Sequence, residues 1–142
     1  PRRTGTYRGQ CAEFCGLQHS HMALDVQVDD GATFAAWRAR QLAPAPAPRT
    51  ASAADGQRVF TSGACMACHA IAGTTAGGRS GPDLTHMASR RTLAAGALPL
   101  TRGTLAAWIA DPQAAKPGTN MPQVPLSPQQ LADVTDYLMT LK

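Results

Sequence analysis

The N-terminal part of the chain carries a strand pattern followed by a helix pattern. Residues 24–28 read Leu-Asp-Val-Gln-Val, and this alternation is typical of a strand with one buried face. The Asp-Asp-Gly run at 29–31 has the composition of a turn. A short helix is then expected over 33–41, where Phe34 and Trp37 lie three residues apart and are assigned to packing.

The C-terminal part of the chain carries helical periods. The helix that precedes residue 65 is expected to begin with Asp55 as its N-cap. Thr101 is expected to cap a second helix, which the Asp-Pro pair at 111–112 ends. A third helix begins at the Ser-Pro pair 127–128. One stripe of this last helix is apolar and consists of Leu131, Val134, Leu138 and Leu141.

A spacer rich in proline and alanine separates these two parts. Residues 43–54 begin with three Ala-Pro pairs and end in an Ala- and Ser-rich run. Alternating proline favours extended polyproline II over helix, at about 3.1 Å per residue, so the spacer could reach roughly 35–40 Å. The chain therefore divides into residues 1–42, a linker over 43–54 and a domain over 55–142.

Composition narrows the possible functions. Only 5% of the 142 residues are aromatic, so a large buried cofactor is expected to add apolar mass to the core. The net charge is +4 and lysine occurs only at Lys116 and Lys142, which is too sparse a basic pattern for nucleic-acid binding. No apolar run reaches the roughly 18 residues of a membrane span. Because the chain begins at Pro1, it is expected to be a segment of a longer protein.

The run Cys65-Met66-Ala67-Cys68-His69 is the strongest chemical signal in the chain. A Cys-x-x-Cys-His sequence is typical of covalent haem c attachment, with two thiols for the porphyrin edge and an imidazole for the iron. Positions i and i+3 share one face of a helical turn, so both sulfurs can point at one macrocycle. The alternatives are a redox dithiol, half of a zinc site or a structural disulfide. A redox dithiol is disfavoured because no βαβ pattern surrounds the run, and a zinc site is disfavoured because no second ligand pair has matching spacing.

A second group of metal-ligand residues lies near the N-terminus. Cys11, Cys15, His19 and Met22 are close together in the sequence, with Gly16 to permit a sharp turn between them. Thiolate, imidazole and thioether ligands together favour copper over magnesium or calcium. Two thiolates could also bridge two copper ions. A disulfide between the two cysteines, or two idle thiols, are the alternatives.

Residues 11–22 resemble the dinuclear copper (CuA) loop of cytochrome c oxidase subunit II, whose pattern is Cys-x-Glu-x-Cys-Gly-x-x-His-x-x-Met. The resemblance extends to about residue 42 and implies that residues 1–42 are the C-terminal remnant of a β-sandwich cupredoxin domain. In that family a further histidine ligand comes from upstream, so this chain alone is not expected to hold an intact dinuclear centre. The implied ligands are Cys11 and Cys15 as bridges, His19 and Met22 as terminal ligands, and the backbone carbonyl of Glu13.

Residues 55–142 resemble a class I cytochrome c, so the fold class is expected to be mainly α. The Gly-Pro-Asp-Leu run around Pro82 matches the family element beside the proximal histidine, which implies that the Pro82 carbonyl accepts a hydrogen bond from His69 Nδ1. Arg90 lies where the family often places a propionate-binding arginine, with a solvated arginine as the alternative. Trp108 is expected to pack against haem, with its indole N–H directed to a propionate or another acceptor.

Met121 is expected to be the distal ligand of the haem iron, opposite His69. It lies in the run Gly-Thr-Asn-Met-Pro, which matches the distal loop of class I cytochromes and could wrap round a porphyrin. Together with the four porphyrin nitrogens, a His/Met pair fills all six iron positions, and it raises the reduction potential, which suits electron transfer. The remaining methionines belong to other elements or lie too near the proximal side, namely Met22, Met66, Met87 and Met139.

The order of these parts resembles subunit II of a caa3-type cytochrome c oxidase. The resemblance implies that a fused haem c takes electrons from a donor, such as a cytochrome c or a quinol-oxidising complex, and passes them to CuA for oxygen reduction in subunit I. It also implies anchoring by upstream membrane helices, at the periplasmic or outer face of a bacterial cytoplasmic membrane. The chain itself would be an electron relay without a catalytic site, inside a proton-translocating oxidase.

Other functions remain open from the sequence alone. One alternative is a mobile or tethered c-type cytochrome that serves another respiratory partner. A haem peroxidase or gas sensor would need an open iron position, which ligation by Met121 would exclude. Nitrous oxide reductase shares the copper motif, but the appended haem domain fits the oxidase better.

Overall fold

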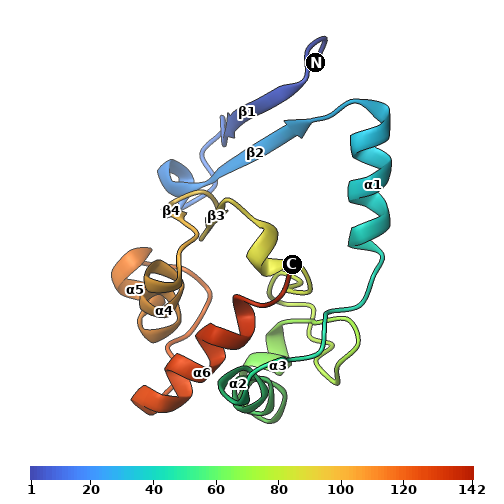
Figure 1. The fold of residues 1–142 in the computed structure, drawn as a ribbon. Coiled ribbons are helices and arrows are strands. Elements are labelled where there is room, and N and C mark those ends of the chain that lie inside the picture. Colours follow the sequence, from blue (N-terminus) through green and yellow to red (C-terminus); the bar gives the residue numbers. More distant parts are fainter.

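Helices joined by loops make up most of the chain in the computed structural model, which describes residues 1–142 (Figure 1). The α-helices are α1 (Gly31–Gln41), α2 (Ala51–Ser62), α3 (Cys65–Cys68), α4 (Arg102–Ala110), α5 (Pro112–Ala115) and α6 (Pro128–Leu138). Two 3-10 turns, η1 (His19–His21) and η2 (Met87–Ser89), and two antiparallel hairpins complete the fold. The hairpins are formed by β1 (Gly5–Gln10) with β2 (Ala23–Val28), and by β3 (Thr92–Leu93) with β4 (Leu98–Pro99).

Helices α2 and α6 cross closely because a glycine lies at the crossing. A Cβ atom added to Gly56 would be 1.9 Å from the backbone oxygen of Asp133 and 2.8 Å from Cβ of Tyr137. Only a residue without a side chain permits this approach. Beside the crossing, the rings of Phe60 and Tyr137 meet edge to face with centroids 6.3 Å apart, a favourable arrangement for two aromatic rings.

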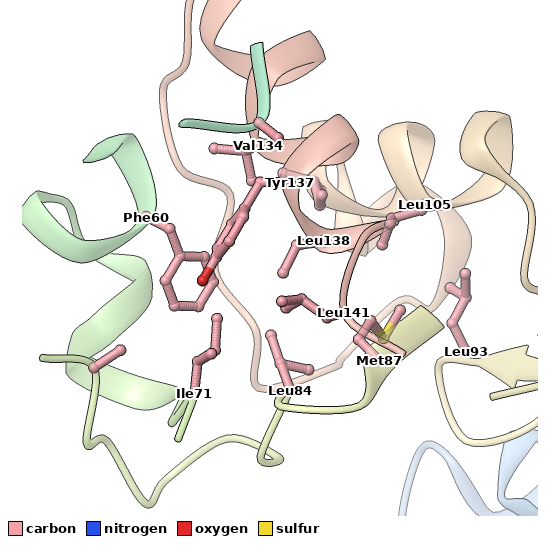
Figure 2. Packing of buried hydrophobic residues seen from close by; sticks show 13 residues of the cluster. Phe60, Ile71, Leu84, Met87, Leu93, Leu105, Val134, Tyr137, Leu138 and Leu141 are labelled. Carbon is pink, nitrogen blue, oxygen red and sulfur yellow. The ribbon is translucent and has the colours of Figure 1, made fainter. Parts of the chain in front are cut away.

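A single cluster of buried apolar side chains fills the space between α2, α4, α6 and the loops around them (Figure 2). The predicted stripe of α6 contributes to it, because Val134, Leu138 and Leu141 are all buried. Met87 is also buried here. The cluster consists of Ala53, Phe60, Ile71, Ala76, Leu84, Met87, Leu93, Leu105, Ile109, Val134, Tyr137, Leu138 and Leu141.

Two of the three predicted helix starts in the C-terminal part are confirmed. Thr101 caps α4 and Ser127 caps α6, each with a capping box. The prediction for α2 was wrong: its N-cap is Thr50, whose side chain accepts a hydrogen bond from the backbone N–H of Ala53. Asp55 lies inside the helix instead. Alanine is the strongest helix former, so the Ala-rich run 51–54 continues the helix rather than the linker.

The predicted N-terminal strand is confirmed and begins one residue earlier, at Ala23. The prediction that one of its faces is buried was wrong, because Leu24 and Val26 are exposed. It pairs with β1 in a register that places Tyr7 opposite Val26 and Gly9 opposite Leu24. Helix α1 follows, with Asp30 as its N-cap. These elements form one hairpin and one helix, and a hairpin of two strands does not by itself identify the domain to which it belongs.

Helix α1 has no buried residue. The predicted packing of Phe34 and Trp37 is limited to a contact between their own rings, whose centroids are 5.6 Å apart, and both side chains are exposed. The expectation that they pack into the protein was therefore wrong for this chain. No helix combines the length and apolar character that crossing a membrane would require.

The linker is held against the C-terminal part. The backbone N–H of Ala45 donates to the carbonyl of Ala72 over 2.9 Å, and Ala45 also packs against the core cluster. Pro44 lies beside Gly73, whose φ of +87° is a conformation that favours glycine. The extended part of the linker therefore ends at Thr50 and is anchored near its middle.

Candidate metal centres

Helix α3 brings the two cysteines of the Cys-x-x-Cys-His run onto one turn. Cys65 and Cys68 are its first and last residues, and both are free thiols that are half-buried. The backbone N–H of His69 donates to the carbonyl of Cys65 over 3.0 Å, which ends the helix at the histidine. Burial raises the pKa of the Cys65 thiol, with Cys68 adding to the effect.

The ring of His69 is fixed by the Gly81-Pro82 segment. Its Nδ1 atom lies 2.7 Å from the carbonyl oxygen of Pro82, so Nδ1 carries the proton and Nε2 is left with a lone pair. Gly81 lies against the ring, where an added Cβ would be 2.6 Å from Cε1. The backbone N–H of Gly81 donates to the carbonyl of Cys68 over 2.7 Å, which links this segment to α3.

The chemistry of α3 and the histidine that follows it fits the attachment of haem. A cavity of about 400 Å³ adjoins Cys65 and is lined on its apolar side by Val59, Val124, Pro125 and Leu126, but its lining does not include Cys68, His69 or Met121. Two free thiols on one turn and an imidazole with an available Nε2 are the donor set that covalent haem c requires. The ligand roles of Cys65, Cys68 and His69 remain predictions that this geometry allows.

The loop that carries Met121 is held by a residue that sequence reasoning missed. The amide nitrogen of Gln113 donates to the carbonyls of Thr119 and Met121, over 2.8 and 3.2 Å. Its amide oxygen accepts from the backbone N–H of Gly118 over 2.9 Å. Met121 itself is half-exposed. Gln113 in α5 therefore fixes the loop at three points, but its residue type and position in the sequence give no sign of this role.

The two predicted haem contacts outside the motif lie in different settings. The guanidinium of Arg90 donates to the backbone carbonyl of Asp83, next to Pro82. Although burial raises it, the pKa of Asp83 is lowered overall by hydrogen bonds from Thr85 and by the charges of Arg90 and His86. Trp108 in α4 is half-buried and packs against the core cluster. The contacts of Arg90 and Trp108 with haem propionates remain predictions.

All the predicted copper ligands lie close together. The Sγ atoms of Cys11 and Cys15 are 3.5 Å apart. Cys15 Sγ lies 3.9 Å from His19 Nδ1 and 3.7 Å from Met22 Sδ. The Glu13 carbonyl is 3.2 Å from Cys11 Sγ. His21, predicted not to be a ligand, is absent from the group of donor atoms.

This donor set fits a soft metal ion. A disulfide has sulfurs about 2.05 Å apart, and the 3.5 Å separation together with the free state of Cys11 and Cys15 excludes that alternative in this structure. The donor atoms of Cys11, Cys15 and His19 all lie within 4.8 Å of one another. The hydrogen bond between the two thiols, with burial and the charge of Cys11, raises the pKa of Cys15. A cation between the sulfurs would favour their ionised form instead.

Backbone hydrogen bonds fold the cysteine loop back on itself. The N–H of Cys11 donates to the carbonyl of Met22, and the N–H of His19 donates to the carbonyl of Gly16, both over 3.0 Å. Gly16 has a φ of +116°, which only glycine adopts readily. Gln10, a residue missed by sequence reasoning, donates its side-chain amide to the Met22 carbonyl over 2.9 Å. These hydrogen bonds therefore give the loop its shape.

Comparison with known proteins finds similar sequences over almost the whole chain. The sequence model of the cytochrome c family matches residues 53–142. Over 97% of its length the chain is 34% identical to cytochrome c oxidase subunit 2 of Alkalihalophilus pseudofirmus and 33% identical to that of Bacillus sp. strain PS3. It is 28% identical to cytochrome c oxidase subunit 2 of Bacillus subtilis over 94% of its length. The chain spans about 40% of the length of these relatives. The predicted resemblance to subunit II with a cytochrome c domain is confirmed.

Proposed function

The chain belongs to the cytochrome c family, and from that premise we propose that it is the electron-relay part of a caa3-type cytochrome c oxidase subunit II. The observation that carries the proposal is the presence of two preformed ligand groups in one chain: the His69–Pro82 pair beside two free thiols, and the cluster around Cys11 and Cys15. When bound, haem iron and copper each supply a one-electron couple.

We propose that residues of the cytochrome c part hold haem c with no open iron position. Cys65 and Cys68 would anchor the porphyrin, while His69 and Met121 would be the axial ligands. Pro82 O keeps the proton on Nδ1 of His69 and so leaves Nε2 for the metal. Gln113 holds the Met121 loop in place. Two protein ligands exclude exchangeable ligands such as oxygen, which suits electron transfer.

We propose that the N-terminal cluster is the CuA site of the parent protein. Cys11 and Cys15 supply thiolates, His19 and Met22 supply the terminal donors, and Glu13 supplies its carbonyl. The cupredoxin domain, the other oxidase subunits, the electron donor and the membrane-attached outer location are proposed on the likeness to the subunit II relatives.

A test of the haem assignment uses the chain produced in a host that attaches haem c. We expect haem to stay with the denatured polypeptide, and the spectrum of the reduced protein to be unchanged by carbon monoxide. Met121→Ala should open one iron position, so that the reduced protein binds carbon monoxide and its reduction potential falls. Met22→Ala is the matched control and should stay indifferent to carbon monoxide. Absence of covalent haem in the wild type would contradict the proposal.

A further inference from the structure

The connection between β3 and β4 has an unusual backbone. Ala94 and Ala95 have φ angles of +54° and +58°, and Gly96 follows with +78°. Left-handed backbone is sterically unfavourable for alanine because its Cβ approaches the carbonyl oxygen. Such conformations persist where surrounding contacts impose them, and they are found at functional positions more often than elsewhere. The contacts made by this turn are therefore the evidence for its role.

The two alanine carbonyls of the turn point at two different partners. Ala94 O accepts a hydrogen bond from Nζ of Lys116 over 3.2 Å, and Ala95 O accepts one from the backbone N–H of Ala23 over 2.9 Å. Ala23 is the first residue of β2 and directly follows Met22 of the copper cluster. The turn thus connects the N-terminal hairpin to the cytochrome c part.

Lys116 is buried without an acidic partner. Only 7% of its surface is exposed, and the ion pairs of the protein are Arg58–Asp55 and Arg102–Asp136. A long charged side chain that is mostly buried makes its polar contacts through its tip, and here Nζ donates to Ala94 O. Lys116 holds the carbonyl of Ala94, and the carbonyl of Ala95 then faces the backbone N–H of Ala23.

A second set of contacts joins the same two regions. The side-chain amide of Gln18 donates to the carbonyl of Pro117. The side chain of Leu17 is 83% exposed but lies next to Gly118, where an added Cβ would be 2.8 Å from Leu17 Cδ1. Both partners precede Met121 in its loop. Figure 1 shows the β3–β4 hairpin beside the start of β2. The copper loop therefore touches the loop of the predicted iron ligand directly.

We propose that the Ala94–Gly96 turn and the Lys116–Gly118 loop form a docking face for the copper loop of the same chain, residues 11–23, and that Lys116 holds this face in shape. Protein atoms alone make these contacts, so the docking does not depend on the function proposed above. It would set the separation of the two ligand groups by contact rather than by the length of the linker.

The test is amide hydrogen exchange, followed residue by residue by NMR, in the full chain carrying covalent haem. We expect the N–H of Ala23 to be protected, and Lys116→Met to make it exchange about five- to tenfold faster, the ratio that loss of one ordinary hydrogen bond gives. Amides of Tyr137 and Leu138 in the core should keep their rates. Lys142→Met removes the other lysine and should leave Ala23 unchanged.

A second variant keeps the proposal testable if Lys116→Met does not fold. Gly96→Ala would place a Cβ 3.0 Å from that of Ala23 at a φ of +78°, and should also release Ala23. Gly103→Ala, where the nearest atom is 3.9 Å away, is the control. Fast exchange at Ala23 in the wild type, or unchanged protection in both folded variants, would overturn the docking. A chain without covalent haem would contradict the proposed function instead.

Discussion

Large apolar side chains are mostly buried in residues 51–142 and mostly exposed in residues 1–42. Apart from Ala23, every buried hydrophobic residue lies in the C-terminal part, and every exposed large hydrophobic residue lies between Tyr7 and Leu42. An isolated two-stranded hairpin is marginally stable in water. The two ligand groups are therefore held by different means: packing supports the environment of His69, whereas turns and backbone hydrogen bonds shape the copper loop. Paired substitutions in the two parts can test this difference.

The largest effect is expected from Gly56→Ala. The new Cβ would meet the backbone of α6 at Asp133, and neither helix can move without opening the core. We expect a loss of about 3 kcal/mol or more in the free energy of unfolding, measured by denaturant titration. The matched substitution Gly31→Ala, at the start of α1, meets nothing within 4 Å and should change that free energy little. Equal effects would refute the proposed division of stability.

Removal of a leucine side chain should separate the two parts in the same way. Leu105 is 2% exposed and Leu24 is 56% exposed. We expect Leu105→Ala to lower the free energy of unfolding by about 2–3 kcal/mol, because it leaves a cavity in the core. Leu24→Ala should stay within about 0.5 kcal/mol of the wild type. A large cost at Leu24 would mean that the hairpin is held by packing after all.

A smaller effect is expected for Gln10, which supports the copper loop through the Met22 carbonyl. Loss of a residue that orients metal ligands costs about 10–100-fold in metal affinity. We expect Gln10→Ala to weaken Cu(I) binding by about tenfold in a competition titration. Gln27 lies on the same hairpin, and its side chain contacts Thr6 and Asp29 instead. The Gln27→Ala variant should therefore bind Cu(I) as tightly as the wild type. Equal losses of affinity in both variants would contradict a specific role for Gln10.

The smallest effect is a difference in acid sensitivity. The hydrogen bond and charge of Arg102 lower the pKa of Asp136, and hydrogen bonds from Thr33 lower that of Asp30. Each carboxylate stabilises the folded form above its unfolded pKa, which is about 3.9. That contribution is lost as pH falls through the lower folded pKa.

Protonation of Asp136 and protonation of Asp30 should nevertheless affect different parts of the protein. Asp136 links α6 to α4 through Arg102 and to α2 through Ser52, so its protonation should lower the melting temperature of the whole protein. Asp30 caps only α1, so its protonation should reduce the helical circular dichroism without changing that melting temperature. Asp136→Asn should remove part of the acid dependence of melting, and Asp30→Asn should not.

Features set by neighbours in the sequence could be predicted, and features set by distant contacts could not. The caps at Thr101 and Ser127 were predicted because each side chain bonds to the backbone three residues ahead. The candidate ligand groups at 65–69 and 11–22 could be proposed because the residues within each are close together in the sequence. Lys116 was missed because its partner, Ala94, is distant in the sequence. Gln113 was missed although its partners are nearby, because no residue pattern indicates the shape of the loop that contains them. Alanine has no preference for positive φ, so the sequence around Ala94 gave no sign of the turn.

The start of α2 shows two local signals in competition. The three Ala-Pro pairs predicted an extended segment, and its end was placed too late because the Ala-rich run after Thr50 was grouped with them. Helix propensity prevails from Ala51 onward, where no proline follows and Thr50 supplies a cap.

The hydrogen bond from Ala45 to Ala72 has a mechanical consequence. Because the linker is attached at Ala45, only the few residues between the end of α1 and Ala45, and between Ala45 and the start of α2, can change the position of the hairpin. Residues inserted after Ala45 would lengthen the linker without increasing the range over which the hairpin can move. A large swing of the hairpin would have to break this bond together with the contacts of Ala23 and Gln18 with the cytochrome c part.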